Sequence, residues 1–461
     1  MRIFKVFFPT RVVGLLVSEV ALIFGCYVAA AYYATETPNM FLFDDGGLYR
    51  IGLVTACVVT GFYFNDLYSQ LRLRSKSRLL QQVCLVLGVT FLIQSLLVYL
   101  RLPDWTLPKW TMIYGSFLVL LVQPGWRVLY DRVVMSRLAR ETVLFLGASP
   151  VARMVAHRLA ENPHFGLSVA GYLEDVPFAD DLPANLLLGP ISHLRDIVAV
   201  LKPQRIIVGM TERRGRLPVL DLLEIRFSGI HIEDAQTAYE TVFSRISVKD
   251  LRPSQLIFMT DLGPRPQSEF WQGVYSFGLA LIGFLIASPV MLLVALLVRF
   301  TSSGPVLYRQ VRVGKNSVNF TLFKFRSMYQ DAEAASGAVW ASKNDPRVTP
   351  LGGWLRRLRL DELPQLINVL RGEMVIVGPR PERPEFVKLL VEQIPYYHQR
   401  LAVKPGITGW AQVNHKYPDT LEDTLLKLEY DLYYIKNLNI TLDLYIMFQT
   451  AKVMLLTRGA Q

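Results

Sequence analysis

Cysteine is scarce in this sequence, and the few cysteines are poorly spaced for covalent or metal chemistry. The chain has 3 cysteines, Cys26, Cys57 and Cys84, and no Cys-x-x-Cys pair. All three fall inside apolar segments that are long enough to cross a membrane. The sequence therefore excludes a disulfide framework and a cysteine-ligated zinc site.

Negative charge is also in short supply. The chain carries 38 acidic residues against 49 lysines and arginines, which gives a formal net charge of +11. A basic excess of this size can indicate nucleic acid binding, but much of it lies beside apolar segments, as in 71–78 and 127–140. We therefore expect the lipid bilayer surface, and no nucleic acid, as the acidic partner.

Long apolar runs, in contrast, are plentiful, since 52% of the 461 residues are hydrophobic. Four runs near the length that spans hydrocarbon open the chain, at about 11–34, 49–68, 82–100 and 110–128. The first is too long for the apolar region of a signal peptide and lacks a persuasive cleavage site, so we expect a retained anchor. Residues 1–140 are predicted to form a four-helix transmembrane bundle.

The flanking charges orient this predicted bundle. The N-terminal tail and the loop 71–78 are basic, whereas the first loop carries Glu36, Asp44 and Asp45. Because lysine and arginine concentrate on the cytoplasmic side, both ends of the bundle are expected in the cytoplasm. Glu19 is unusual, since an ionisable group at membrane depth is costly. A functional role, a place in the bundle interior and an interfacial contact all remain open for it.

From 141 to 262 the pattern changes to short apolar strands that alternate with amphipathic segments. The strands are expected at 142–147, 167–173 and 205–209, and the helices at 151–160 and 218–227. This βαβ order predicts a parallel sheet in a Rossmann-like cytoplasmic domain.

The phosphate-binding turn of this domain is incomplete. A dinucleotide fingerprint has three glycines, but Gly147-Ala-Ser149-Pro-Val-Ala152 keeps the first and lacks the second. We therefore favour a structural or regulatory domain over a cofactor site. Glu174 and Asp175 lie where a ribose-binding acid would fall, but acidic loop residues are too common to decide the question.

A fifth apolar segment, 274–298, is long enough to cross the membrane. A full crossing would place the basic residues that follow it on the wrong side. Ser288-Pro289 near its middle offers a remedy, because proline removes a helical hydrogen bond and favours a bend. A helix broken there can enter and leave by one face, with the Ser288 hydroxyl satisfying a freed backbone group. An ordinary kinked span remains the alternative.

The stretch 352–381 holds the adjacent carboxylates Asp361 and Glu362. Asp361 is predicted to cap a helix over 362–370 that ends at Gly372. Phosphate is favoured beside such a helix end, and a carboxylate among cations stays ionised. An ionised aspartate is a nucleophile for phosphorus, and the adjacent glutamate can accept a proton. Taken alone, an acidic residue before an apolar run is more often a simple helix cap.

Two strands, 305–314 and 319–326, are expected to form a hairpin that delivers Lys324 and Arg326 toward the same carboxylates. Alternating charge on an antiparallel pair is often only a solvated face. The residues alone favour that simpler interpretation.

Taken together, the motifs resemble one family. They are Lys324-Phe-Arg326-Ser-Met, Arg356, Asp361-Glu362-Leu-Pro, Gly378-Pro379-Arg380-Pro381 and Lys404-Pro-Gly-Ile-Thr-Gly-Trp-Ala-Gln-Val-Asn414. From about Phe270 onward the chain resembles the bacterial sugar transferases, which are monotopic polyprenyl-phosphate phosphoglycosyl transferases. The remainder resembles the larger members, with four N-terminal membrane helices and a Rossmann-like domain. The resemblance implies the re-entrant form of 274–298, with Ser288-Pro289 as its break.

The resemblance also implies a mechanism. Asp361 would attack the β-phosphate of a UDP-sugar and release UMP, and Glu362 would then help undecaprenyl phosphate attack the sugar-phosphoryl aspartate. Mg²⁺ is implied, with Asp361 as its protein ligand. The other implied substrate- or phosphate-binding residues are Lys324, Arg326, Arg356, Pro379, Arg380, Pro381, Lys416, Asp431 and Asp443. His415, Lys416 and Arg359 depart from the family pattern.

The sequence thus predicts a membrane protein of the bacterial inner membrane, with an α/β catalytic domain at 263–461 on the cytoplasmic side. It would start exopolysaccharide or related glycan synthesis. The alternatives are a membrane-anchored nucleotide-sugar dehydratase or epimerase, which the absence of any Tyr-x-x-x-Lys disfavours, and a non-enzymatic nucleotide-sensing scaffold. The sequence leaves open which sugar and pathway are used, whether a homodimer forms and what the middle domain binds.

Overall fold

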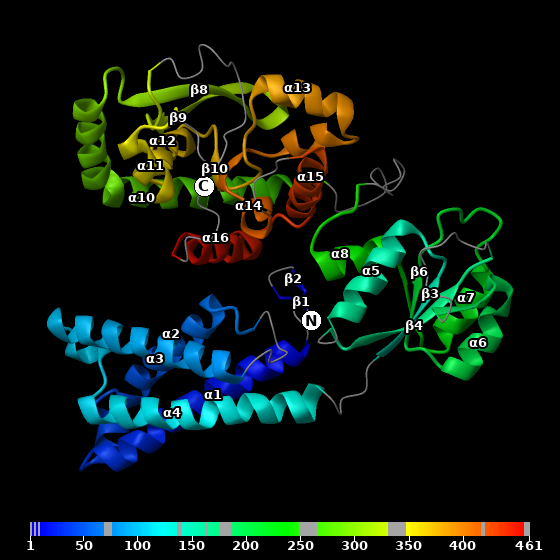
Figure 1. Cartoon of the computed structure of the whole chain (residues 1–461), viewed down its shortest axis with the longest axis horizontal. Helices are drawn as coiled ribbons and strands as arrows, with labels where there is room; N and C mark the ends of the chain where they lie inside the picture. Colours follow the sequence, from blue (N-terminus) through cyan, green and yellow to red (C-terminus); the bar gives the residue numbers. More distant parts are fainter. Residues whose placement is uncertain are drawn as a thin grey trace. The chain divides into compact units, whose positions relative to one another are not determined.

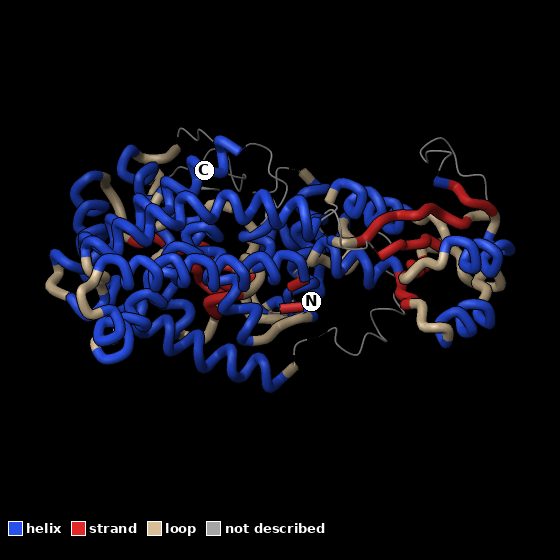
Figure 2. Tube along the Cα trace, turned by 90° about the horizontal axis from the view of Figure 1, so that it is seen from below, coloured by secondary structure: helices blue, strands red, loops and turns tan. Residues whose placement is uncertain are grey.

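The computed structural model describes most of the chain. The described residues are 2–3, 6–7, 10–68, 76–135, 141–162, 165–175, 186–248, 263, 265–330, 347–415 and 420–455. They fall into two compact units, one mainly of 8–149 and 153–233 and the other mainly of 234–461. Helices make up most of the described residues, and the strands form one five-stranded sheet and several two-stranded ones (Figures 1 and 2).

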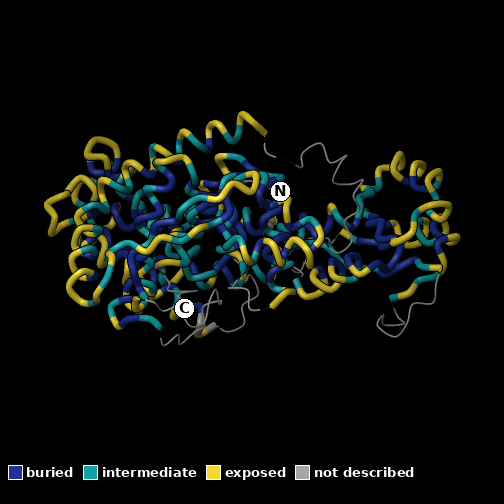
Figure 3. The backbone as a smooth tube through the Cα atoms, turned by 90° about the horizontal axis from the view of Figure 1, so that it is seen from above, coloured by how far each residue is buried: buried dark blue, intermediate teal, exposed yellow. Residues whose placement is uncertain are grey.

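All four predicted N-terminal apolar segments are helices. These are α1 (Thr10–Ala34), α2 (Gly47–Phe64), α3 (Lys76–Tyr99) and α4 (Lys109–Tyr130). Buried apolar side chains of all four helices share one core, while many other apolar side chains of these helices are exposed. Figure 3 colours the backbone of the chain by the burial of each residue. Each helix is long and apolar enough to cross a membrane.

Glu19 lies in the interior of this bundle. Its side chain is 0% exposed, and Arg127 Nη2 donates to its Oε2 at 2.9 Å. Tyr68 and Gln123 donate to the same carboxylate. Glu19 therefore lies in the bundle interior, with the partner charge and the hydrogen bonds that a buried carboxylate requires, and a functional role for it stays untested.

The predicted βαβ order of the middle segment is confirmed. Five strands line up as β5-β4-β3-β6-β7, and the pairs β3–β4, β3–β6 and β4–β5 are parallel. The elements are β3 (Glu141–Leu146), α5 (Pro150–Glu161), β4 (Leu167–Leu173), β5 (Leu187–Gly189), α6 (Leu194–Leu201), β6 (Arg205–Val208), α7 (Val219–Phe227) and β7 (His231–Asp234). Helices α6 and α7 pack on this sheet through a shared buried core.

The incomplete phosphate turn of this sheet is already engaged by the protein. Gly147 has a φ of 92°, and the following backbone N–H, of Ala148, donates to Glu174 Oε2 at 3.0 Å. In proteins with the complete fingerprint, the backbone N–H groups of this turn bind the dinucleotide phosphate. Here one of those N–H groups is bonded to the Glu174 carboxylate instead. This contact agrees with a structural or regulatory role for the domain.

The second unit begins earlier than the predicted boundary at 262/263. Helix α8 (Ala235–Phe243) belongs to it, together with the segment that follows. Tyr239 donates to Glu429 at 2.9 Å, and Trp410 Nε1 donates to the Ser244 carbonyl at 2.8 Å. Residues assigned by sequence to the middle domain therefore pack in the same unit as the predicted catalytic residues.

Helix α10 (Pro266–Thr301) contains the fifth apolar segment and is helical across Pro289. The predicted interruption of the helix is therefore a bend within continuous helix, and Figure 1 shows two arms that run in different directions. Pro289 has no N–H for the Leu285 carbonyl, and Ser288 Oγ donates to that carbonyl at 2.8 Å. The predicted compensation by Ser288 is confirmed.

Both arms of α10 pack on the same unit. Ala280 in the first arm shares a core cluster with Leu322, and Val298 in the second shares one with Phe325. A straight helix of this length would extend about 54 Å. The bend brings both arms against one strand, β9, while the membrane topology of α10 remains a prediction.

The remaining elements of this unit surround the predicted site. They are β8 (Leu307–Val313), β9 (Asn319–Phe325), α11 (Pro350–Arg357), α12 (Gln365–Leu370), β10 (Val375–Val377), α13 (Pro384–Gln393), β11 (Gly406–Thr408), α14 (Trp410–Asn414), α15 (Leu421–Lys436) and α16 (Ile440–Leu455). Short 3-10 helices are η7 (Lys315–Ser317), η8 (Leu360–Glu362) and η9 (Tyr397–Ala402). The other short elements of the chain are β1 (Arg2–Ile3), β2 (Val6–Phe7), η1 (Met40–Asp44), η2 (Pro103–Trp105), η3 (Asp131–Met135) and η6 (Ile191–His193).

Candidate active site

The two adjacent carboxylates lie in η8, a separate turn between α11 and α12. The prediction that Asp361 caps the next helix is wrong, because α12 starts at Gln365 and Pro364 stands at its cap position. Arg359 adopts a left-handed conformation with a φ of 55°, which turns the chain before the pair. With 6 residues, α12 is too short for the helix-end argument to hold. Gly372, with a φ of 76°, follows its end as predicted.

Glu362 is held by three cations. Arg380 Nη2 lies 2.8 Å and Lys324 Nζ 3.1 Å from its Oε1, and Arg359 Nη1 lies 3.6 Å from its Oε2. Burial acts to raise the pKa of Glu362, but the charges of Arg380, Lys324 and Arg359 outweigh it and bring the pKa far below its usual range. Glu362 is therefore ionised in this structure, and two of the predicted phosphate-binding cations are its partners.

Asp361 has a different environment. It is 7% exposed and, within the described residues, accepts no hydrogen bond and forms no ion pair. Burial raises the pKa of Asp361, the charge of Glu362 adds to that rise, and Lys324, Arg356 and Arg380 oppose it only in part. The sequence argument that cations keep Asp361 ionised thus describes Glu362 better. Adjacent carboxyl groups with opposite shifts are typical of a divided chemical role.

The Gly-Pro-Arg-Pro turn follows β10 and brings Arg380 to Glu362. Strand β10 pairs in parallel with β11, so the turn lies beside Pro405 and Gly406. A Cβ on Gly378 would stand 2.6 Å from the Lys404 carbonyl, which requires glycine there. Pro379 and Pro381 are buried, and both accept hydrogen bonds through their carbonyls. In this structure the prolines act by holding the backbone that carries Arg380.

Arg356 supports the pair from α11. Its Nε donates to Ser327 Oγ at 2.9 Å, just beyond the end of β9. Helix α11 approaches that segment so closely that a Cβ on Gly352 would meet the Ser327 carbonyl at 1.9 Å. Cations from β9, from α11, from the residue before η8 and from the Gly-Pro-Arg-Pro turn therefore act on the two carboxylates.

Three other predicted site residues have internal partners. Arg326 is buried at the end of α10, where Nη2 donates to the Ser302 carbonyl at 2.7 Å and Nη1 to the Pro305 carbonyl. Asp431 pairs with Arg400 at 2.8 Å. Asp443 accepts from Gln272 and Tyr434, each at 2.8 Å. These contacts do not join them to Asp361, and their substrate-binding roles stay predictions.

Lys416 lies outside the described residues, whereas its neighbour His415 is described. His415 stacks on Tyr430, and burial lowers the pKa of its imidazole despite Asp423. The structure therefore describes the departure from the family pattern at His415, and the substrate-binding role of Lys416 stays a prediction.

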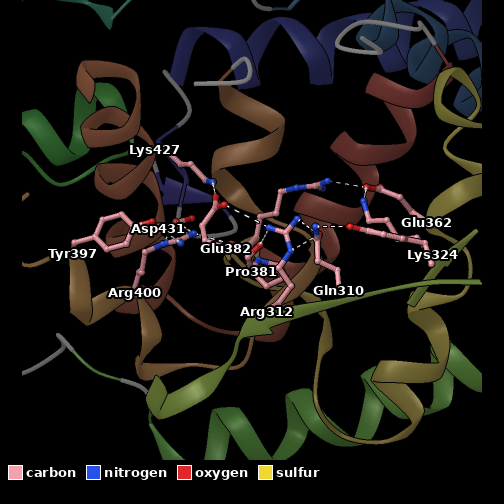
Figure 4. A network of polar contacts seen from close by, with 12 residues as sticks. Gln310, Arg312, Lys324, Glu362, Pro381, Glu382, Tyr397, Arg400, Lys427 and Asp431 are labelled. Atoms are coloured by element: carbon pink, nitrogen blue, oxygen red, sulfur yellow. Dashed lines mark hydrogen bonds and ion pairs between the residues drawn. The ribbon is translucent and has the colours of Figure 1, made fainter. Parts of the chain in front are cut away.

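Sequence reasoning missed a group of buried and half-buried charged residues beside the turn. Arg312, Glu382, Arg400 and Lys427 link the turn to β8, η9 and α15 (Figure 4). Nothing in the local pattern marks them, because their partners lie far away in the chain.

The residues present fit a magnesium ion only with the help of a substrate. Among the described residues no three His, Cys, Asp or Glu side chains gather as a ready metal site. Asp361 offers a buried carboxylate without a protein partner, while Glu362 is occupied by cations. Mg²⁺ commonly binds one or two carboxylates together with substrate phosphates, and Asp361 matches that pattern.

Comparison with known proteins identifies the family of the chain. The model of the bacterial sugar transferase family matches residues 267–457. A UDP-N-acetylgalactosamine-undecaprenyl-phosphate N-acetylgalactosaminephosphotransferase of Aeromonas hydrophila is 35% identical over 81% of this chain and 86% of its own. A UDP-glucose:undecaprenyl-phosphate glucose-1-phosphate transferase of Klebsiella pneumoniae is 35% identical over 68% of this chain and 67% of its own. The chain therefore belongs to the bacterial sugar transferase family.

Proposed function

We propose that this protein transfers sugar 1-phosphate from a UDP-sugar to undecaprenyl phosphate, giving undecaprenyl-diphosphate-sugar and UMP. The observation that carries the proposal is the contrast within the acid pair. Asp361 is buried without a protein partner, and Glu362 gathers three cations. A phosphate that enters beside Asp361 meets those cations directly. The names of the relatives support this donor and acceptor class, and they give no support to a dehydratase or epimerase.

In the first half-reaction Asp361 Oδ attacks the β-phosphorus of the donor. The bond between that phosphorus and the oxygen of UMP breaks, and UMP leaves with the electron pair. Lys324 and Arg380 turn from Glu362 to the phosphate oxygens and stabilise the charge that develops there. Mg²⁺ bound by Asp361 and the substrate phosphates would neutralise further charge.

In the second half-reaction an oxygen of undecaprenyl phosphate attacks the same phosphorus. The bond from phosphorus to Asp361 breaks, and the carboxylate is restored. Glu362 can take the acceptor's proton once its cations have moved to the phosphates, because those cations are what depress its pKa. In the proposed mechanism, donor binding would therefore release Glu362 to act as a base.

The proposed location is the cytoplasmic face of the bacterial inner membrane. UDP-sugars are cytoplasmic, and a helix α10 that enters and leaves by one face keeps the acid pair on that side. The exposed apolar side chains of both α10 arms, such as Phe277, Ile286 and Leu293, would contact lipid. The acceptor's lipid tail would approach the pair along the same surface.

Purified protein in lipid nanodiscs tests the proposal. It is incubated with Mg²⁺, undecaprenyl phosphate and a panel of UDP-sugars that includes UDP-glucose and UDP-N-acetylgalactosamine. UMP and a lipid-linked sugar diphosphate should form with at least one donor. Failure of every donor to release UMP, from protein that is folded and membrane-inserted, would overturn the proposal.

A further inference from the structure

The backbone of the Gly-Pro-Arg-Pro turn is held at almost every carbonyl. Five of the six carbonyls from Val377 to Glu382 accept hydrogen bonds from other elements. The donors are Tyr434 Oη to Val377 at 2.8 Å, the Gly406 N–H to Pro379 at 3.0 Å, Arg400 Nη2 to Arg380 at 2.9 Å, Arg312 Nη1 to Pro381 at 2.9 Å and the Val313 N–H to Glu382 at 2.9 Å. The turn is therefore fixed before any substrate arrives.

The bond to Arg380 comes from a buried guanidinium. Arg400 is 2% exposed, and its charge is matched by Asp431, which is 1% exposed. Arg400 Nε and Nη2 lie 3.0 and 2.8 Å from Asp431 Oδ2, and Nη1 donates to Tyr397 Oη at 3.1 Å. Figure 4 shows Arg400 between Tyr397, Asp431 and the turn. The planar guanidinium of Arg400 thus connects η9, which carries it, to Asp431 of α15 and to the carbonyl of Arg380.

The stability of the fold alone does not explain why the buried Arg400–Asp431 pair is present. A buried arginine–aspartate pair gains little over a well-packed apolar pair, because both charges lose their water. Placement of Arg380 offers a better reason, since its side chain is the shortest contact of Glu362 among the three cations. Small displacements of charge-stabilising groups cause large losses of rate.

We propose that Arg400 is a positioning residue for the reaction, which acts only by fixing the peptide of Arg380 so that the Arg380 guanidinium meets the donor phosphate. Arg400 itself touches no substrate. The inference rests on the proposed function, because UMP release is the reaction that Arg380 would serve. Asp431, which the resemblance assigns to substrate, would serve in this view as the counter-charge of Arg400.

A second arginine that pairs with an acidic residue of α15, Arg245, offers a matched control. Arg245 pairs with Glu429 at 3.3 Å, and both side chains are largely buried. Its guanidinium also lies over aromatic rings, as that of Arg400 lies over Tyr397. Within the described residues Arg245 forms no hydrogen bond or ion pair with the turn that carries Arg380, so Arg245→Lys removes a largely buried guanidinium without disturbing that turn.

The experiment measures UMP release and thermal unfolding of the full chain for Arg400→Lys, Arg245→Lys, Arg380→Lys and the double variant Arg380→Lys/Arg400→Lys. The two single changes at 400 and 245 should lower the unfolding temperature similarly. Arg400→Lys should lower the rate of UMP release at least about 10-fold, and Arg245→Lys less than about 2-fold. In the Arg380→Lys background the further loss from Arg400→Lys should shrink to less than about 3-fold.

Equal rate losses for Arg400→Lys and Arg245→Lys, or fully multiplicative losses in the double variant, would overturn the positioning role. If Arg400→Lys does not fold, Tyr397→Phe removes one partner of Arg400 and should still lower the rate a few-fold without effect in the Arg380→Lys background. Absence of UMP release from the unaltered protein would instead reject the proposed function. The two failures are therefore distinguishable.

Discussion

Arg380 Nη2 lies 2.8 Å from Glu362 Oε1, so the Gly-Pro-Arg-Pro turn and the acid pair are joined by a direct ion pair. The same oxygen lies 3.1 Å from Lys324 Nζ. Glu362 is therefore paired with the same two cations, Lys324 and Arg380, that a substrate phosphate would contact. The ion pairs of Glu362 thus give two carboxylates that are adjacent in sequence different environments.

Removal of the Glu362 charge should affect the two half-reactions differently. Glu362→Gln leaves Lys324 and Arg380 available to the donor, so UMP release with UDP-sugar alone should fall less than about 10-fold. Transfer to undecaprenyl phosphate should fall by about 100-fold or more, because the acceptor's proton loses its base. The two steps are followed by UMP release and by lipid-linked product. Equal losses in both would indicate that Glu362 is a metal ligand or a structural residue.

The bend of α10 predicts that both of its ends face the cytoplasm. Single cysteines are introduced by Ser268→Cys and Ser303→Cys after replacement of the three native cysteines. A membrane-impermeant thiol reagent should label both from the cytoplasmic side and neither from the periplasm. Periplasmic labelling at 303 would show a full crossing. Ser268 is chosen because the neighbouring Glu269 is paired with Lys315.

Pro289→Ala supplies a second test of the bend. Alanine at position 289 has a backbone N–H that can bond to the Leu285 carbonyl. This hydrogen bond favours a straight α10. Activity should fall while membrane insertion persists. Ala287→Ser, beside the bend and with the proline retained, is the control.

Asp443 predicts a pH dependence of stability. Burial raises the pKa of Asp443 from 3.8 to about 6, so the folded protein binds this proton more tightly than the unfolded chain. The free energy of unfolding should therefore decrease as pH rises from about 4 to about 6, by up to about 3 kcal/mol, and then level off. Asp443→Asn should flatten this segment, whereas Glu385→Gln at an exposed position should not. An unchanged slope in Asp443→Asn would contradict the assignment.

Because the main segment of the second unit begins at Asp234, two internal deletions that differ in whether they keep α8 should have different effects. Deletion of 141–233 keeps α8 and its contacts, and the protein should retain UMP release. Deletion of 141–262 removes the hydrogen bond from Tyr239 to Glu429, which is only 4% exposed. A buried carboxylate left without that partner should destabilise the unit and lower activity further. Equal activity of the two deletions would show that α8 is dispensable.

Much of the architecture could be predicted from sequence because the strongest signals are periodic. The apolar runs of α1 to α4 and the βαβ order of β3 to β6 depend on hydrophobic patterning, and both are present. The sequence does not predict the short strands β5 and β7, since β5 has only 3 residues and β7, His-Ile-Glu-Asp, is mostly polar, whereas the equally short β6 is an apolar run.

The local geometry of the acid pair could not be predicted in the same way. A left-handed Arg359 separates the pair from α11, and Pro364 separates it from α12, and the motif specifies neither conformation. Arg326 is two residues from Lys324 but lies just beyond the end of β9, so its side chain turns to the end of α10. The role of Arg400 depends on Asp431 and Arg380, which are distant in the chain.

The most direct measurement of the central claim is mass spectrometry of the protein after incubation with Mg²⁺ and a UDP-sugar that supports turnover, without undecaprenyl phosphate. The account predicts a sugar-phosphate adduct on Asp361 and a matching amount of free UMP, with neither in Asp361→Asn. Undecaprenyl phosphate added afterwards should remove the adduct. UMP release only when both substrates are present, with no adduct on Asp361 after rapid quenching, would contradict the account.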